Sequence, residues 1–132
     1  MRARLILPVL FLASVLFGMG ASMAQSLSAQ SSSAAGVTIK ATPRALSGGA
    51  WEFEIVFDTH TQELKDDLMK SASLASDGRS LAPAAWKGDP PGGHHRKGVL
   101  RFDAADPQSK TIELTITRPG EPKPRSFRWQ LK

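Results

Sequence analysis

Four side chains of this 132-residue sequence have the chemistry of metal ligands: Asp58, His60, His94 and His95. Neutral imidazole is the commonest metal ligand where cysteine is absent, and a carboxylate is its usual companion. Asp58 and His60 are two residues apart, so an extended strand places both on one face. The two adjacent histidines diverge in an extended chain and converge only if the glycines before them allow the loop to curl. The pattern predicts a Zn²⁺ or Cu²⁺ site, although its spacing is less diagnostic than His-Glu-x-x-His.

The same residues also fit a purely structural role. Asp58 would then cap a helix or accept hydrogen bonds at a strand end, and His60 would lie in a first helical turn. The run His94-His95-Arg96 would donate hydrogen bonds that close its loop onto nearby acids. Catalysis is not indicated, because the sequence has no nucleophile elbow and so small a domain rarely has room for a substrate pocket. We therefore expect a protein that is not an enzyme.

The charge and cysteine content narrow the classes of partner. The chain has no cysteine, which excludes disulfides, thiolate metal ligands and blue-copper chemistry. Its formal net charge is +5, and basic residues become frequent near the carboxyl end. They favour an anionic cell-surface partner such as lipopolysaccharide, but a solvated strand face explains them equally well. Acidic side chains such as Glu63, Asp66 and Asp67 are also expected to face water. Nucleic acid is not an expected partner.

The first residues have the features of an export signal. A basic start (Met1 to Arg4) precedes an apolar stretch from Leu5 to about Gly18, and small residues at Ser22 and Ala24 form a cleavage site. We expect cleavage after Ala24 and a periplasmic or secreted protein that is not an integral membrane protein. Residues 25–36, rich in serine and alanine, are expected to form a flexible leader before a single domain over 37–132.

Beyond residue 36 the hydrophobic pattern has the period of β-strands. Seven strands are expected, at about 37–41, 51–58, 69–76, 79–86, 99–103, 112–117 and 127–131. Pro43 is expected to end the first strand, a short helical turn is expected over 60–68, and Asp77-Gly78 predicts a type I′ hairpin. Short strands at about ten-residue spacing predict an all-β, immunoglobulin-like or fibronectin-like antiparallel sandwich.

The order of the strands predicts where the histidines lie. Short connections in all-β domains usually join antiparallel neighbours, so successive connections alternate between the two ends of the sandwich. The connections at 58–68, 88–97 and 119–124 should therefore emerge at one end, and the Asp77-Gly78 hairpin at the other. All three histidines are predicted to share the first of these ends.

One loop carries a resemblance to known proteins. The run Trp86-x-Gly-x-Pro-Pro-Gly-Gly-His-His-Arg96-x-Gly98, with the upstream Trp51-x-Phe-x-Ile-x-Phe-Asp-Thr-His60, resembles small exported prokaryotic proteins of unassigned function. This resemblance implies an immunoglobulin-like sandwich and implies no activity, cofactor or site. Two hypotheses remain. The first is an exported module that binds Zn²⁺ or Cu²⁺, and the second is a monomeric structural or adhesive module that contacts an unknown protein or an anionic surface without metal.

Overall fold

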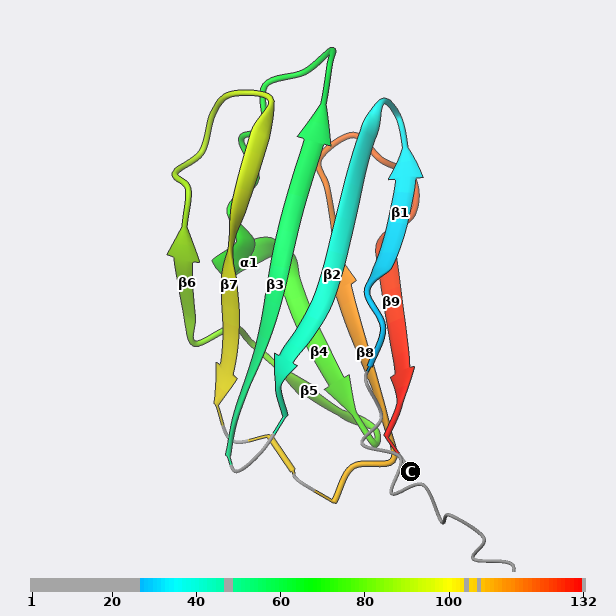
Figure 1. Cartoon of the computed structure of the whole chain (residues 1–132). Coiled ribbons are helices and arrows are strands. Elements are labelled where there is room, and N and C mark those ends of the chain that lie inside the picture. Colours follow the sequence, from blue (N-terminus) through cyan, green and yellow to red (C-terminus); the bar gives the residue numbers. More distant parts are fainter. Residues whose placement is uncertain (1–26, 47–48, 104, 107, 132) are drawn as a thin grey trace, which may run out of the picture.

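The computed structural model describes residues 27–46, 49–103, 105–106 and 108–131, which form two antiparallel sheets packed face to face (Figure 1). The expected all-β sandwich is confirmed. The expected signal peptide, residues 1–24, lies outside the described residues. In the described part of the chain, no helix is long and apolar enough to span a membrane.

Nine strands and one short helix are present in the described ranges. The first sheet has the order β1-β2-β3-β7-β6, with β1 at Gln30–Ala34, β2 at Val37–Ala45, β3 at Ala50–Thr59, β7 at His95–Asp103 and β6 at Ala85–Gly88. The second has the order β5-β4-β8-β9, with β5 at Arg79–Leu81, β4 at Ala72–Ser76, β8 at Thr111–Ile116 and β9 at Arg125–Gln130. Helix α1, Leu68–Ser71, leads into β4.

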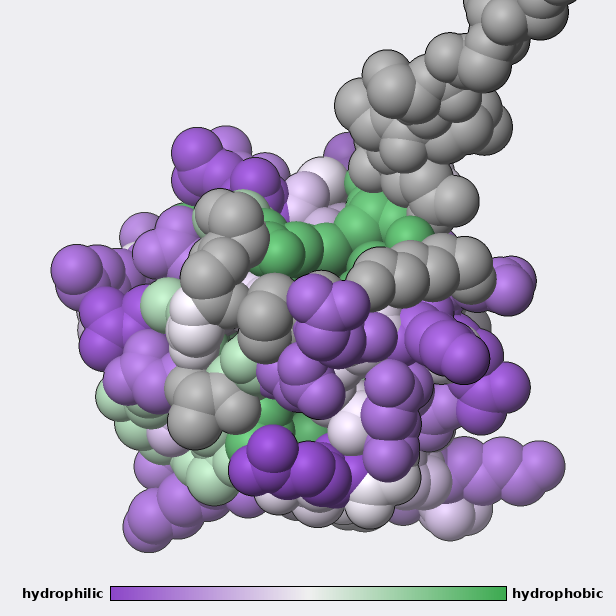
Figure 2. All heavy atoms as spheres, turned by 90° about the horizontal axis from the view of Figure 1, so that it is seen from below, coloured by the Kyte–Doolittle hydropathy of each residue, from purple (hydrophilic) through white to green (hydrophobic). Residues whose placement is uncertain are grey.

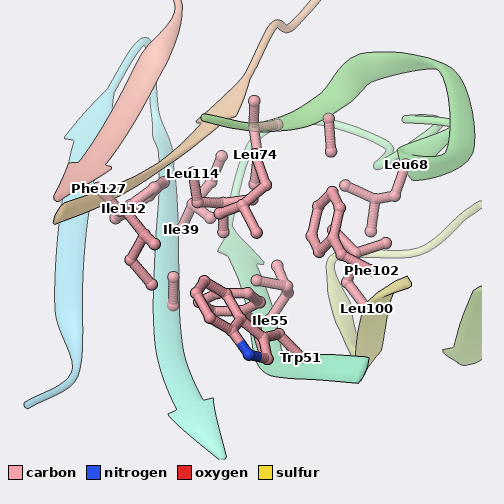
Figure 3. Close-up of a cluster of buried hydrophobic side chains, with 14 of the residues drawn as sticks. Ile39, Trp51, Ile55, Leu68, Leu74, Leu100, Phe102, Ile112, Leu114 and Phe127 are labelled. Atoms are coloured by element: carbon pink, nitrogen blue, oxygen red, sulfur yellow. The ribbon is translucent and has the colours of Figure 1, made fainter. Parts of the chain in front are cut away.

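The core lies between the sheets and follows the alternation of the sequence. Four large apolar side chains of β3 are fully buried: Trp51, Phe53, Ile55 and Phe57. They alternate with residues that are partly or fully exposed. Apolar side chains of both sheets and of α1 point toward one another in the interior (Figure 3). Phe53 packs edge-on against Phe102, with ring centroids 5.9 Å apart, and also contacts Trp129 across the sandwich at 5.5 Å. The strand pattern expected for this segment is therefore correct.

Two strands beyond the expected seven have identifiable causes. The Ser-rich segment expected to be a flexible leader forms β1, because its backbone pairs with β2 and its side chains bond to β9. The Gln30 amide bonds both the N–H and the carbonyl of Arg128, and Trp129 Nε1 donates to Ser28 O at 2.8 Å. The expected strand over 79–86 is divided around Pro83, so that β5 lies in one sheet and β6 in the other.

Two expectations for individual segments are wrong. Strand β2 continues through Pro43, which is tolerated because the pairing with β1 stops at Ala41 and leaves this part of β2 at an edge. The helical turn expected over 60–68 is limited to α1, for which Asp67 is the N-cap and accepts from Met69 N at 3.0 Å. The preceding residues are not helical because Leu64 uses its backbone N–H and C=O to bond the β6–β7 loop.

The hairpin prediction is confirmed. Asp77 and Gly78 have φ values of 45° and 86°, as a type I′ turn between β4 and β5 requires. This hairpin lies at one end of the sandwich. The β1–β2 turn and the β3–α1, β6–β7 and β8–β9 connections lie at the other, which we call the loop end (Figure 1, top). At the end opposite to the loop end, hydrophilic side chains surround a smaller hydrophobic area (Figure 2).

Candidate functional site at the loop end

All three histidines belong to the loop end, as the alternation of strand direction predicted. His95 is the register partner of Asp58 across β3 and β7. One step further, the backbone N–H of Thr59 donates to the carbonyl of His94 at 3.0 Å, and His60 follows directly. Residues 35 and 37 positions apart in the sequence are therefore neighbours in space.

Of the four predicted metal ligands, the structure brings two into contact. Asp58 Oδ1 and His95 Nδ1 are 2.5 Å apart, and their side chains are 58% and 59% exposed. His60 and His94 are also exposed. Among the residues that the structure describes, no group of three or more His, Cys, Asp or Glu side chains is arranged to hold a metal ion. The metal prediction thus has a single carboxylate–imidazole pair as its structural support.

The Pro-Pro-Gly-Gly loop is fixed by main-chain hydrogen bonds. Gly92 N donates to Leu64 O at 2.6 Å, and Leu64 N donates to Gly93 O at 2.9 Å. The two glycines have φ values of 121° and 71°, which L side chains rarely adopt. The glycines therefore allow a reversal that binds this loop to the β3–α1 connection.

Arg96 lies inside the protein rather than on the loop surface. It is 1% exposed, and its guanidinium donates to the carbonyls of Asp66 (2.6 Å) and Asp89 (3.3 Å). The guanidinium carbon lies 5.7 Å from the centroid of the Trp86 ring, a cation–π contact. The structural alternative expected Arg96 to reach acids; its partners are instead backbone carbonyls and an aromatic face.

The glycine spacing of the loop is explained by Trp86. This ring covers the place where β6 and β7 pair through Gly88 and Gly98. A Cβ atom on Gly98 would lie 2.6 Å from the ring, and one on Gly88 would lie 2.4 Å from the Gly98 Cα. Trp86 Nε1 also donates to Asp89 O at 3.1 Å. The motif that carries the resemblance is thus largely architectural.

A chain of buried charges crosses the loop end. Arg118 Nε and a terminal nitrogen donate to the two carboxylate oxygens of Asp66 at 2.9 and 3.1 Å, and Arg118 also donates to Glu121 at 2.9 Å. Glu121 in turn accepts from Arg125 at 2.6 and 2.9 Å. Burial lowers the pKa of the Arg118 guanidinium, but Asp66 and Glu121 outweigh it and raise the pKa above its usual value. The hydrogen bond from Arg125 is the largest effect that lowers the pKa of Glu121.

Arg125 extends this chain to the first strands. It donates to the carbonyls of Ser32 (2.8 Å), Ala34 (2.8 Å) and Val37 (3.2 Å), on both sides of the β1–β2 turn. We call these linked residues the loop-end network. Arg96 bonds the main-chain carbonyl of Asp66, and from there negative and positive side chains alternate through Asp66, Arg118, Glu121 and Arg125. The network joins all four connections of the loop end.

Sequence reasoning missed this network. Asp66 was expected to face water, and Arg118 and Arg125 were expected on a solvated face or at an anionic partner; all three are buried. The alternation of inward and outward side chains along β8 and β9 already indicated that these arginines point inward. Arg118 continues the inward series Ile112, Leu114, Ile116, and Arg125 begins the inward series Phe127, Trp129.

The fold and this end define the chain as a β-sandwich whose loops are held together by buried ion pairs. Comparisons with protein-family models, curated proteins and solved structures found no match.

Proposed function

We propose that this protein is an exported, non-enzymatic interaction module that binds a partner through its loop end. The observation that carries the proposal is the loop-end network. Loops of a sandwich are usually its most mobile and variable parts. Here four connections are tied to one another beneath exposed polar groups such as the Asp58–His95 pair. A surface that is already ordered loses less conformational entropy when it binds.

The buried charged side chains of the network contribute more to the conformation of the loops than to the stability of the fold. Removing charged groups from water costs free energy that the attraction within a buried ion pair only partly offsets. Apolar side chains at these positions would give a core of similar stability. Arginine and carboxylate side chains add directional hydrogen bonds, and these fix how the loops lie.

Site-specific photo-crosslinking in cells of the source organism tests this proposal. A photoreactive amino acid at His94 on the loop end is compared with one at Arg79, an exposed residue beside the β4–β5 turn at the opposite end of the sandwich. The proposal expects adducts from the His94 position and few from the Arg79 position. Adducts that form equally from both positions, or from Arg79 alone, would contradict it.

Divalent metal binding is a second candidate, favoured by the Asp58–His95 hydrogen bond. A carboxylate on Nδ1 orients the imidazole and leaves Nε2 for a metal, with the other ligands supplied by solvent or by a partner. Calorimetry with Zn²⁺ and Cu²⁺ decides the matter: no heat and no rise in melting temperature in excess metal would remove this candidate. Metal binding at this pair should be lost in His95→Ala.

Export has its own test. The basic and apolar first residues support removal of residues 1–24 by a signal peptidase. The protein recovered from the cell envelope or medium should therefore begin at Gln25. Recovery of the chain with Met1 from the cytoplasm would contradict export without affecting the loop-end proposal.

A further inference from the structure

Strand β1 is held mainly by contacts to its backbone. None of its five residues is buried, and its sequence, Gln-Ser-Ser-Ser-Ala, offers no large apolar side chain to either face. One edge of its backbone pairs with β2 along the whole strand, from Gln30 opposite Ala41 to Ala34 opposite Val37. Ahead of the strand, Leu27 is partly buried against the core. Strands that bury so little on either face are weakly specified and prone to exchange between copies.

The other edge of β1 is bonded by side chains of β9. Arg125 donates to Ser32 O and Ala34 O, both at 2.8 Å. Trp129 Nε1 donates to Ser28 O at 2.8 Å, two residues before the strand. Every extended residue presents such a carbonyl, so these donors suit a strand from another copy equally well. We call the edge of β2, together with Arg125 and Trp129, the β1 slot.

The turn between β1 and β2 is short and strained. It consists of Ala35 and Gly36, with φ values of 49° and 77°, and the first value is unfavourable for a residue with a Cβ atom. Thr59 Oγ1 donates to Gly36 O at 2.8 Å, and the Gln62 amide donates to Ala35 O. Both turn residues are exposed, so water replaces these two bonds when the turn opens. Short hinges under strain favour exchange of the strand that they connect.

We propose that two copies of this chain exchange β1 and thereby form a dimer. In the dimer each turn is extended, and each β1 occupies the β1 slot of the other copy with the same bonds to β2 and β9. Because β1 lies at the edge of its sheet, its departure leaves the pairing of the other strands intact (Figure 1). Extension also removes the left-handed conformation of Ala35. The partner is a second copy of the chain, so this inference goes beyond the interaction proposed for the loop end.

Disulfide trapping tests the exchange, because the chain has no cysteine of its own. Ser33 and Thr38 are register partners on β1 and β2, and their hydroxyl oxygens are 2.8 Å apart. A Ser33→Cys protein is mixed with a Thr38→Cys protein and oxidised. The two thiols become register partners only when β1 of the first protein lies in the β1 slot of the second. The mixture should therefore accumulate a covalent heterodimer.

The matched control mixes Ser33→Cys with Thr115→Cys. Thr115 is partly exposed, as Thr38 is, but it lies on β8, which β9 separates from β1. Random collision links the control pair, whereas exchange holds the first pair at a millimolar effective concentration. At about 0.1 mM protein, the first pair should therefore give roughly tenfold more heterodimer. Equal yields after prolonged incubation would overturn the proposal.

Two adjacent alanine substitutions, each introduced into both proteins of the first pair, test the role of the turn. Ala35→Gly removes the cost of the left-handed conformation in the monomer, so it should lower the yield of heterodimer at least about fivefold. Ala34→Gly adds the same flexibility one residue earlier, outside the turn, and should not lower the yield. Equal yields from the two variants would show that strain in the turn does not drive the exchange, which would contradict the inference.

Discussion

Asp66 and Arg118 lie 52 positions apart in the sequence and form a two-pronged ion pair inside the loop end. Their side chains are 1% and 7% exposed. Removing one partner of such a buried pair destabilises the fold by much more than the pair itself stabilises it, because the remaining charge is left buried without compensation.

Asp66→Asn should therefore lower the free energy of unfolding by about 3 to 5 kcal/mol, measured by chemical denaturation. The matched control is Glu63→Gln, three residues earlier in the same connection, whose ion pair with Lys65 is exposed. That change should stay within about 0.5 kcal/mol. A loss below about 1 kcal/mol for Asp66→Asn would mean that the pair is hydrated in solution.

Glu121 gives the network a dependence on pH. Hydrogen bonds from Arg125 and then Arg118 lower the pKa of this carboxyl against the opposing effect of burial. A carboxyl with a lowered folded pKa contributes stability that is fully present above its ordinary value of 4.5 and is lost as the pH falls through the folded value.

The free energy of unfolding should accordingly decrease below about pH 4.5, and Glu121→Gln should make that decrease smaller while lowering stability at neutral pH. Denaturation curves of both proteins between about pH 7 and pH 3 provide the measurement. Identical pH profiles would assign the acid sensitivity to other carboxyl groups.

At the scale of elements, the β6–β7 hairpin is the part in which the motif residues act together. Trp86 packs on two glycines, and Arg96 lies beneath the loop with its guanidinium against the Trp86 ring. Neither glycine is explained by a positive φ; both are explained by the close approach of an aromatic ring and of the paired strand.

Gly98→Ala should destabilise the protein by about 1 to 3 kcal/mol, because the added Cβ would lie 2.6 Å from the Trp86 ring and 2.8 Å from the Gly88 Cα. Gly49→Ala is the control, since a Cβ at Gly49 meets nothing within 4 Å. Thermal denaturation of both variants gives the comparison. Equal melting temperatures would show that Trp86 moves away without loss.

The elements also show how far sequence reasoning reaches. The central strands, the type I′ hairpin and the common end of the histidines follow from alternation, turn chemistry and strand direction, all of which are local rules. Strand β1 could not be predicted this way, because serine-rich residues bury little apolar surface and are ordered by hydrogen bonds to β2 and β9. The division at Pro83 depends on which sheet offers an edge, a property of the whole fold.

The candidate site follows the same division. That Asp58 and His95 would lie at one end of the sandwich could be predicted from strand parity, but the register that pairs them could not. A helix over 60–68 was expected because Leu64 and Leu68 are four apart, and both are buried. Their burial arises from a non-helical connection, because the backbone of Leu64 is bonded to the β6–β7 loop. Hydrogen bonds between segments thus outweighed local helical spacing.

At the scale of the whole molecule, the loop-end network connects both sheets. It begins at Arg96 on β7 of the first sheet, passes through Arg118 after β8 of the second, and returns from Arg125 on β9 to the β1–β2 turn. The two sheets are therefore joined at this end by polar contacts, in addition to the apolar core between them.

Amide hydrogen exchange tests directly whether the loop end is one ordered unit. The amides of Thr59, Leu64 and Gly92, which bond across separate connections, should exchange nearly as slowly as those of the central strands, and Asp66→Asn should accelerate them. Exchange of these three amides at the rate of unprotected loop residues in the unsubstituted protein would show that the loop end is not an ordered unit.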